Sequence, residues 1–252
     1  MLDWSYLRRY ALPLGAFIGV LTLWVSVVVF YEVPSYVFPS PTDIVEAFAD
    51  NGPRLWESSV TTFSTSVTGL GIAASLGFIL AIIFVRFQWV EQAFMPYVIL
   101  TQTTPIVAVA PLIVLWAGSG LVSRAIVSML ICFFPIVVNS VKGFRSADRS
   151  QLELLQTYNA YPSQEMVMLR VPAAMPDIFA ALRISATLCV VGSIVAELVT
   201  GNSGLGFLIL QASYSLDTPL LFAAVLCAAS MGVGLFLAVA GVERLTPQCR
   251  RG

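Results

Sequence analysis

The sequence lacks histidine altogether, and only 11% of its 252 residues are charged. Histidine is the commonest metal ligand of proteins and the commonest general base near neutral pH. Its absence removes most metalloenzyme and catalytic-triad classes, so we predict no catalytic residue and no metal site. The chain also lacks the G-x-x-x-x-G-K-[ST] phosphate loop, and it therefore cannot itself act as a P-loop ATPase.

The few charges nearly balance, and the few cysteines are not paired by their spacing. Thirteen basic and 14 acidic residues give a net charge of −1, which provides no basic surface for a nucleic acid. Three of the four cysteines lie in apolar segments, and none forms a C-x-x-C pair. We therefore expect neither a disulfide framework nor a zinc site, and we interpret the cysteines as small residues packed in the interior.

Apolar residues are abundant: 58% of the chain is hydrophobic and the mean hydropathy is +0.87, far above the usual range for a soluble domain. A helix needs about 20 residues to cross the hydrocarbon of a bilayer, where it satisfies its own backbone. The charge-poor segments predict an all-α membrane protein that forms a single domain over residues 1–252. We predict about six transmembrane helices, over residues 10–31, 58–85, 92–118, 125–141, 176–200 and 218–242.

The third of these segments contains Pro96, Pro105 and Pro111, which must bend or interrupt it. Unwinding there would expose backbone carbonyls and polar side chains to a central passage, whereas a kink could equally serve packing alone. The candidate residues of such a translocation pathway are Gln102, Thr103 and Thr104.

Basic residues predict the orientation in the membrane, because loops that remain in the cytoplasm carry an excess of Lys and Arg. An even number of crossings places both termini on one side, and only Arg54 and Arg124 fall on the other. We therefore predict cytoplasmic termini, and an external segment at residues 32–57 that begins as extended chain and continues as a short amphipathic helix. The basic residues on the cytoplasmic side are Arg8, Arg9, Arg86, Lys142, Arg145, Arg149, Arg170, Arg183, Arg244, Arg250 and Arg251.

A polar segment, residues 146–172, separates the fourth and fifth predicted spans. Asp148 is a candidate N-cap of a short amphipathic helix, and Asn159 follows at a position that favours a positive φ. Pro162-Ser163 then predicts a turn and a new N-cap, and Pro172 is expected to end a second helix. This cytoplasmic helix-turn-helix is either a solvated connecting loop or, as its caps and apolar face favour, a docking segment.

The spacing within this segment resembles the EAA signature, EAA-x3-G-x9-I-x-LP, of the inner-membrane subunits of bacterial ABC importers. Glu153 opens the motif, Asn159 takes the place of its glycine and Pro172 ends it. The departures are leucine for both alanines and for the isoleucine, and valine for the last leucine. Further similarity to the permease group for nitrate, sulfonates and taurine, which includes importers of pyrimidine-type thiamine precursors, covers residues 103–120, 133–148, 171–185 and 196–209.

The resemblance implies that the chain is the transmembrane subunit of an ATP-driven importer in the bacterial inner membrane. It implies a second copy of the permease, two cytoplasmic ATP-binding subunits that use ATP and Mg, and an external solute-binding protein that delivers a small organic or inorganic solute. No cofactor is expected on this chain, whose work is conformational rather than enzymatic. The residues implied to couple it to the ATP-binding subunits are Glu153, Leu154, Leu155, Asn159, Ala160, Tyr161, Pro162, Leu169, Val171 and Pro172.

Glu197 lies deep in the fifth predicted span, where an ionisable side chain is costly and functional by default. It is either part of the pathway or a structural residue. Direct pairing with Arg183 is not expected, because fourteen residues separate the two, about 21 Å along a straight helix. The alternative function is an ion-coupled carrier or an intramembrane enzyme that uses these residues. The docking segment, and the absence of histidine and of paired acids, argue against it.

Three further features each have two interpretations. Arg124 could attract anions at the external end, but an interfacial anchor is favoured. Residues 201–206, GNSGLG, look like a nucleotide loop but follow no strand, so we expect a flexible external turn or gate. Gly15 and Gly19 match the close-packing motif of membrane helices, and we expect them to pack within the subunit rather than at the seam between two copies. Few basic groups lie near any passage, which favours a neutral or heterocyclic solute.

Overall fold

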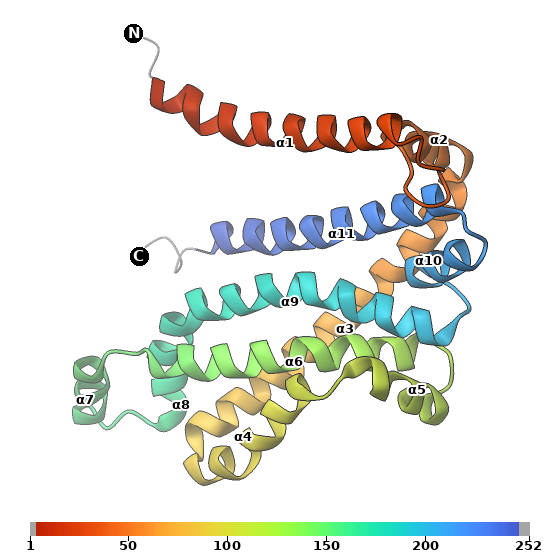
Figure 1. The fold of residues 1–252 in the computed structure, drawn as a ribbon. Coiled ribbons are helices and arrows are strands. Elements are labelled where there is room, and N and C mark those ends of the chain that lie inside the picture. Colours follow the sequence, from red (N-terminus) through yellow and green to blue (C-terminus); the bar gives the residue numbers. More distant parts are fainter. Residues whose placement is uncertain (1–3, 247–252) are drawn as a thin grey trace.

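The computed structural model describes residues 4–246, and every regular element in that range is a helix, as predicted (Figure 1). Arg250 and Arg251, which enter the predicted orientation, lie outside these residues. The elements are α1 (Trp4–Phe30), α2 (Pro41–Asp50), α3 (Gly52–Arg86), α4 (Gln88–Thr103), α5 (Ile106–Ala117), α6 (Leu121–Arg145), α7 (Arg149–Thr157), α8 (Pro162–Glu165), the π-helical turn η1 (Met166–Arg170), α9 (Val171–Thr200), α10 (Leu205–Tyr214) and α11 (Thr218–Leu245).

Four helical stretches are long and apolar enough to cross a membrane: α3, α6, α11 and the continuous helix Pro162–Thr200. A fifth span results if α4 and α5, bent by 101° relative to each other, are counted as one. The prediction of about six spans also included the first helix, of which Leu14–Phe30 is an apolar stretch. The chain is therefore an all-helical membrane protein with four or five long apolar spans and α1 beside them.

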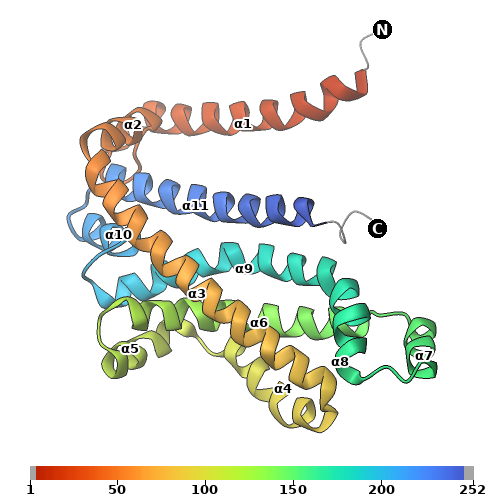
Figure 2. The same cartoon turned by 180° about the vertical axis from the view of Figure 1, so that it is seen from behind.

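The core forms where α6 and α9 pack along each other and α3 crosses them (Figures 1 and 2). Glycines permit the close approach. A Cβ at Gly192 would lie 2.8 Å from the Cα of Ser128, and a Cβ at Gly69 would lie 2.6 Å from the Cβ of Ser128. Cys132 and Cys189 are fully buried and unpaired in this interface, which confirms the interpretation of these two cysteines as packing residues.

The third predicted span is interrupted at one of its three prolines. Thr104 is extended, with φ −74° and ψ 127°, and Pro105 precedes the first turn of α5. A residue that precedes proline is disfavoured in the helical region, so Thr104 leaves the helix. Pro96 and Pro111, by contrast, lie inside α4 and α5. The break therefore belongs to Thr104 and Pro105 alone.

Helix α1 is attached to the rest of the chain near its C-terminal end. The indole N–H of Trp24 donates to the carbonyl of Pro39 at 3.1 Å, and its ring packs against Phe222 at 6.2 Å between centroids. Nothing lies within 4 Å of a Cβ added at Gly15 or Gly19. The prediction that these glycines pack within the subunit is wrong, because this part of α1 runs apart from the other helices (Figures 1 and 2).

The segment between α1 and α3 contains the short amphipathic helix that the sequence predicts. Ser40 caps α2 reciprocally with Asp43: the Ser40 hydroxyl accepts from the backbone N–H of Asp43 at 3.2 Å, and its own N–H donates to the carboxylate at 2.9 Å. Ile44 and Ala47 are buried. This helix lies at one end of the molecule with α5 and α10, whereas α7 and α8 lie at the other end (Figure 1).

Candidate functional site

Helix α7 projects beyond the ends of α6 and α9 (Figures 1 and 2). Asp148 caps it, as predicted, by accepting a hydrogen bond from the backbone N–H of Ser150 at 2.9 Å. Arg149 and Glu153 form an exposed i,i+4 ion pair along it at 3.1 Å. Exposed ion pairs of this kind contribute little to stability in water. We therefore attribute the orientation of α7 to its caps and not to this pair.

The elbow after α7 is a Schellman motif. Asn159 has a φ of +54°, which confirms the predicted left-handed conformation. Its N–H donates to the carbonyl of Gln156 at 2.9 Å, and the N–H of Ala160 donates to the carbonyl of Leu155 at 3.0 Å. These bonds satisfy the last carbonyls of α7 and reverse the chain direction.

The second helix of the segment begins two residues earlier than predicted and does not end where predicted. Tyr161, not Ser163, is its N-cap, and the Tyr161 N–H donates to Gln164 Oε1 at 2.8 Å. Pro162 occupies the first helical position, where its missing N–H costs nothing. The helix then continues through Pro172 into α9, because the wider π turn of η1 accommodates a ring that would clash inside an α-helix.

The ten residues implied to couple the chain to ATP-binding subunits fall into two sets. Leu155, Ala160, Leu169, Val171 and Pro172 are half-buried, whereas Glu153, Leu154, Asn159, Tyr161 and Pro162 are exposed. Five large apolar side chains of the segment from α7 to η1, which we together call the apolar tip, are each more than half exposed: Leu154, Tyr158, Tyr161, Val167 and Met168.

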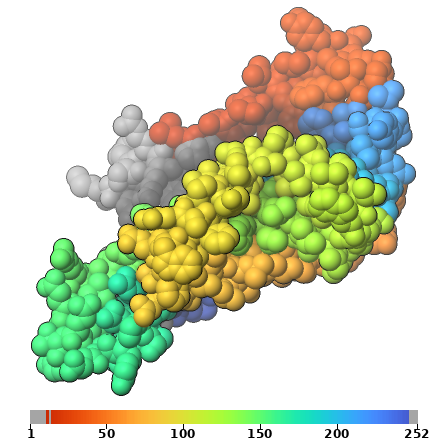
Figure 3. Space-filling view, turned by 90° about the horizontal axis from the view of Figure 1, so that it is seen from below, coloured from red at the N-terminus to blue at the C-terminus, as the bar shows by residue number. Residues whose placement is uncertain are grey.

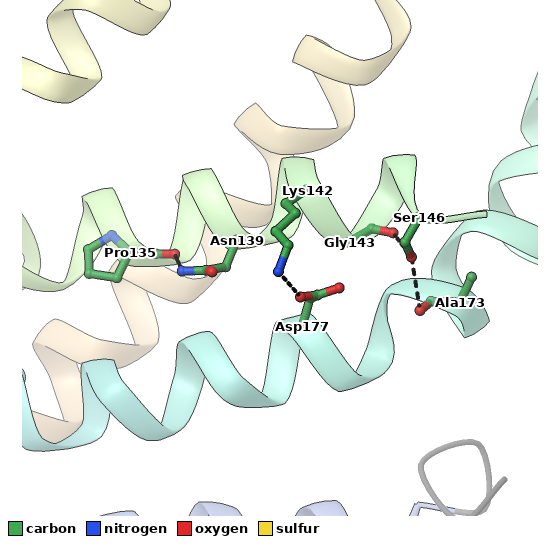
Figure 4. A network of polar contacts seen from close by, with 7 residues as sticks. All are labelled: Pro135, Asn139, Lys142, Gly143, Ser146, Ala173 and Asp177. Carbon is green, nitrogen blue, oxygen red and sulfur yellow. Dashed lines mark hydrogen bonds and ion pairs between the residues drawn. The ribbon is translucent and has the colours of Figure 1, made fainter. Parts of the chain in front are cut away.

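Polar contacts hold the base of this segment to α6 (Figure 4). Lys142 Nζ donates to Asp177 Oδ1 at 3.1 Å, and Arg170 donates from Nη1 to the carbonyl of Phe144 at 3.0 Å. A Cβ at Gly143 would lie 2.9 Å from that of Asp177, so α6 and α9 are in direct backbone contact here.

A further ion pair joins the last turn of α6 to the first turn of α4. Arg145 donates from Nη1 to Glu91 Oε1 at 3.0 Å, and its Nη2 reaches Oε2 of the same carboxylate. The Glu91 side chain is only 13% exposed. This two-point geometry fixes direction as well as distance.

Glu197 lies in the last turn of α9 rather than deep within the span, and it is fully buried. Its Oε2 accepts from the Thr62 hydroxyl at 2.8 Å and from the backbone N–H of Gly206 at 2.9 Å. The same hydroxyl accepts from the N–H of Leu205 at 2.9 Å. Glu197 and Thr62 together therefore cap the first turn of α10, an arrangement of a structural residue. Arg183 instead pairs with Glu243 of α11 at 3.2 Å.

The expected flexible turn at residues 201–206 is tied to its surroundings. Asn202 donates to the carbonyl of Ser119 at 3.1 Å, and Arg124 donates to the Ser203 hydroxyl at 2.9 Å. Arg124 is only 8% exposed, so its interpretation as an interfacial anchor is wrong: the turn covers it. Helix α10, which follows, was not predicted, since its ten residues are too short for a span.

Two adjoining hollows lie at the break between α4 and α5, on the face that Figure 3 shows with α4 in yellow. They have volumes of about 370 and 230 Å³ and share Thr101 and Leu130. Of the predicted pathway residues, Thr104 lines a hollow, whereas Gln102 and Thr103 do not. No charged side chain lines either one; the walls are formed by Leu76, Ile79, Leu80, Ile83, Tyr97, Leu100, Thr101, Thr104, Ile106, Val109, Met129, Leu130 and Phe133.

The chain resembles known transport proteins over most of its length. The riboflavin transport system permease protein RibX of Chloroflexus aurantiacus is 35% identical over 89% of this chain and 85% of its own. The formylaminopyrimidine transport permease protein ThiX of Halalkalibacterium halodurans is 33% identical over 83% of this chain and 84% of its own. A chain of the inward-facing MetNI methionine ABC transporter shares the fold, with a TM-score of 0.61 at 16% identity, over 77% of this chain and 94% of that chain.

The family of binding-protein-dependent transport system inner membrane components matches residues 73–251. The match includes the segment from α7 to η1, the hollows at the α4–α5 break and the cap that Glu197 forms. The work of such a component is transport. The chain therefore belongs to the family of inner membrane components of binding-protein-dependent transport systems.

Proposed function

We propose that this chain, paired with a second copy of itself, forms the translocation pathway of an ATP-driven importer. Two ATP-binding subunits dock on the segment from α7 to η1, and an external solute-binding protein delivers the solute. The observation that carries this proposal is the apolar tip. Large apolar side chains exposed at the end of a membrane protein that faces water mark a surface for a partner.

The two sets of coupling residues suggest a division of work. The exposed set, with Tyr161 and Pro162 at the elbow, contacts the ATP-binding subunit. The half-buried set, with Leu169 and Pro172, anchors the segment on the transmembrane helices. Movement of the docked subunits thereby displaces α9 as well as α7, which shifts the equilibrium between two packings of the spans.

The orientation follows from the charges around the tip. The start of α1 and the end of α11 lie at the same end of the molecule as α7 and α8 (Figure 1). Loops rich in Lys and Arg remain in the cytoplasm, so this end faces the cytoplasm and α2 and α10 face outward. Basic residues at the α7 end are Arg86, Lys142, Arg145, Arg149 and Arg170.

We assign to the solute the chemistry of an uncharged, planar nitrogen heterocycle. The hollows at the α4–α5 break provide apolar and aromatic walls, with the hydroxyls of Thr101 and Thr104 as polar groups. An anion such as nitrate or a sulfonate would meet no cation there, and desolvating it unpaired is costly. Riboflavin and formylaminopyrimidine, which the names of two relatives specify, are heterocycles of this kind.

The test is uptake by proteoliposomes that contain the chain with its ATP-binding subunit and solute-binding protein. Labelled riboflavin, an aminopyrimidine, taurine and nitrate are supplied separately, with ATP enclosed. We expect uptake of a heterocycle that requires ATP hydrolysis and is insensitive to an uncoupler. Uptake that continues without ATP and collapses with the uncoupler would establish an ion-coupled carrier instead. ATP-dependent uptake of taurine or nitrate alone would retain the importer and reject the heterocycle.

A further inference from the structure

We propose that the ion pair between Arg145 and Glu91 is a positioning contact that transmits displacement of the α7–η1 segment to the broken helix α4–α5. The inference rests on the proposed importer function and deepens it. Two side chains outside the EAA-like motif thereby form the mechanical link between the docking segment and the hollows.

One end of the link belongs to a rigid body. The last turns of α6 are joined to the start of α9 by the ion pair of Lys142 with Asp177 and by the bond from Arg170 to the Phe144 carbonyl. At Gly143 the two helices are closely packed, since an added Cβ would lie 3.1 Å from the carbonyl oxygen of Ala174 (Figure 4). The end of α6 therefore moves with η1 whenever the docked segment moves.

The other end of the link belongs to α4. Among the ion pairs of residues 4–246, the pair of Arg145 with Glu91 is the one that joins α4 to this body. Glu91 lies in the first turn of α4 and Arg145 in the last turn of α6. The helix macrodipole favours a negative charge at the start of a helix and a positive charge at its end, so both charges are favourably placed. The two hydrogen bonds of the pair fix the relative position of the two side chains, so a displacement of α6 in either direction also displaces α4.

The hollows lie where a displacement of α4 would change their shape. Glu91 is thirteen residues from Thr104, about 20 Å along α4. Beyond the break, α5 is held against α6 and α9 by the buried cluster around Ala110 and Val127. Pro135 lies inside α6 between Val127 and Arg145, so the Arg145 end of α6 can bend relative to the half that holds α5. Displacing α4 at its Glu91 end while α5 stays with that half bends the chain at Thr104 and moves Tyr97 relative to Leu130. The pair thereby connects the state of the ATP-binding subunits to the shape of the hollows.

The competing explanation is a structural ion pair that only adds stability. Partly exposed pairs typically contribute little to stability. Loss of such a pair would lower the melting temperature and leave the number of solute molecules moved per ATP hydrolysed unchanged. The two explanations therefore differ in the coupling ratio, defined as uptake divided by ATP hydrolysis in the same vesicles.

The experiment compares the reconstituted transporter with Glu91→Gln, Arg145→Gln, the single reversals Glu91→Arg and Arg145→Glu, and the double reversal. We expect each single variant to lower the coupling ratio at least about fivefold while ATP hydrolysis persists, and the double reversal to recover most of it. Arg183→Gln is the matched control, because it removes an ion pair of similar exposure, with Glu243 of α11, that does not involve α4. It should change the ratio less than about twofold.

A second measurement follows the motion itself. Thr104→Cys, with Cys227 and Cys249 replaced by serine, is labelled by a thiol reagent with and without trapped nucleotide. The labelling rate should depend on nucleotide in the parent and lose that dependence with Glu91→Gln. Unchanged coupling ratios in the single variants, failure of the double reversal to recover the ratio, or nucleotide-dependent labelling that survives Glu91→Gln would each overturn the inference. Uptake by the parent that needs no ATP would instead overturn the proposed function.

Discussion

The carboxylate of Glu197 accepts a hydrogen bond from the backbone N–H of Gly206 at 2.9 Å, so the last turn of α9 caps the first turn of α10. Thr62 joins the same cap from α3 through its hydroxyl. Helix α3, the end of α9 and the start of α10 are therefore held at one point by one buried side chain. The N-terminus of a helix favours a negative charge, and the contacts at Oε2 offset part of the cost of burying this carboxylate, whose Oε1 has no hydrogen-bond partner.

Substitution at Glu197 separates a structural role from a proton relay. Glu197→Ala leaves the N–H of Gly206 without its partner and removes one acceptor of the Thr62 hydroxyl, and we expect a loss of about 1–3 kcal/mol in the free energy of unfolding. Glu197→Gln keeps an acceptor oxygen and should retain both the native melting temperature and uptake. Thermal unfolding in detergent and vesicle uptake check the two variants. A native melting temperature with abolished uptake in Glu197→Gln would restore the carrier hypothesis.

Gly204 tests how closely the turn at residues 201–206 is shaped around this carboxylate. Its φ is +94°, and an added Cβ would lie 2.2 Å from Glu197 Cδ. Gly204→Ala therefore combines backbone strain with a collision, and we expect more than about 3 kcal/mol of destabilisation. Gly201→Ala is the matched control, since its φ is +62° but nothing lies within 4 Å of its Cβ. It should cost about 1 kcal/mol, which unfolding in detergent can distinguish.

The local features of the docking segment could be predicted because each depends on neighbours a few residues away. Asp148 caps the N–H of a residue two positions along, and Asn159 adopts the left-handed conformation that ends α7. The start of the second helix was predicted too late, although proline is favoured at the first helical position, which Pro162 occupies. The continuation through Pro172 was missed, because it depends on a π turn that no residue type specifies.

The cap around Glu197 could not be predicted from the sequence. Thr62 and Glu197 are 135 residues apart, and no periodicity reports on a contact at that separation. Arg124 was misread for the same reason, since the turn that covers it comes from the end of α9. Of these residues, only Glu197 could be recognised in the sequence as unusual, because it is an ionisable residue in an apolar segment. That feature does not distinguish a residue of the translocation pathway from a helix cap.

Asn159 provides a test of the elbow. Asn159→Gly keeps access to a positive φ and should leave binding of the ATP-binding subunit unchanged. Asn159→Val places a β-branched residue in the left-handed region, which costs about 1–2 kcal/mol, and should displace Tyr161. We expect weaker co-purification of the ATP-binding subunit with the valine variant. Equal binding by the two variants would mean that the elbow geometry is not used in docking.

The apolar tip can be tested at Tyr161, which is 72% exposed. Tyr161→Glu places a charge within the surface that we assign to the ATP-binding subunit, and both binding and uptake should fall while the melting temperature stays the same. Tyr214→Glu is the matched control: its side chain is 81% exposed and lies in α10, at the opposite end. Retained binding in the Tyr161 variant, or equal loss in both, would place the docking surface elsewhere.

Leu130 tests whether the hollows form the passage, because it lines both of them. Leu130→Phe enlarges the side chain into a space of about 370 Å³, so it should be tolerated without the usual cost of overpacking a filled core. If solute moves through this space, the variant lowers the rate of uptake and leaves ATP-binding-subunit association intact. Leu130→Met conserves volume and serves as the control. Unaltered uptake in the phenylalanine variant, with expression and melting temperature matched, would mean that the solute crosses the membrane along another surface, such as one formed with the second copy.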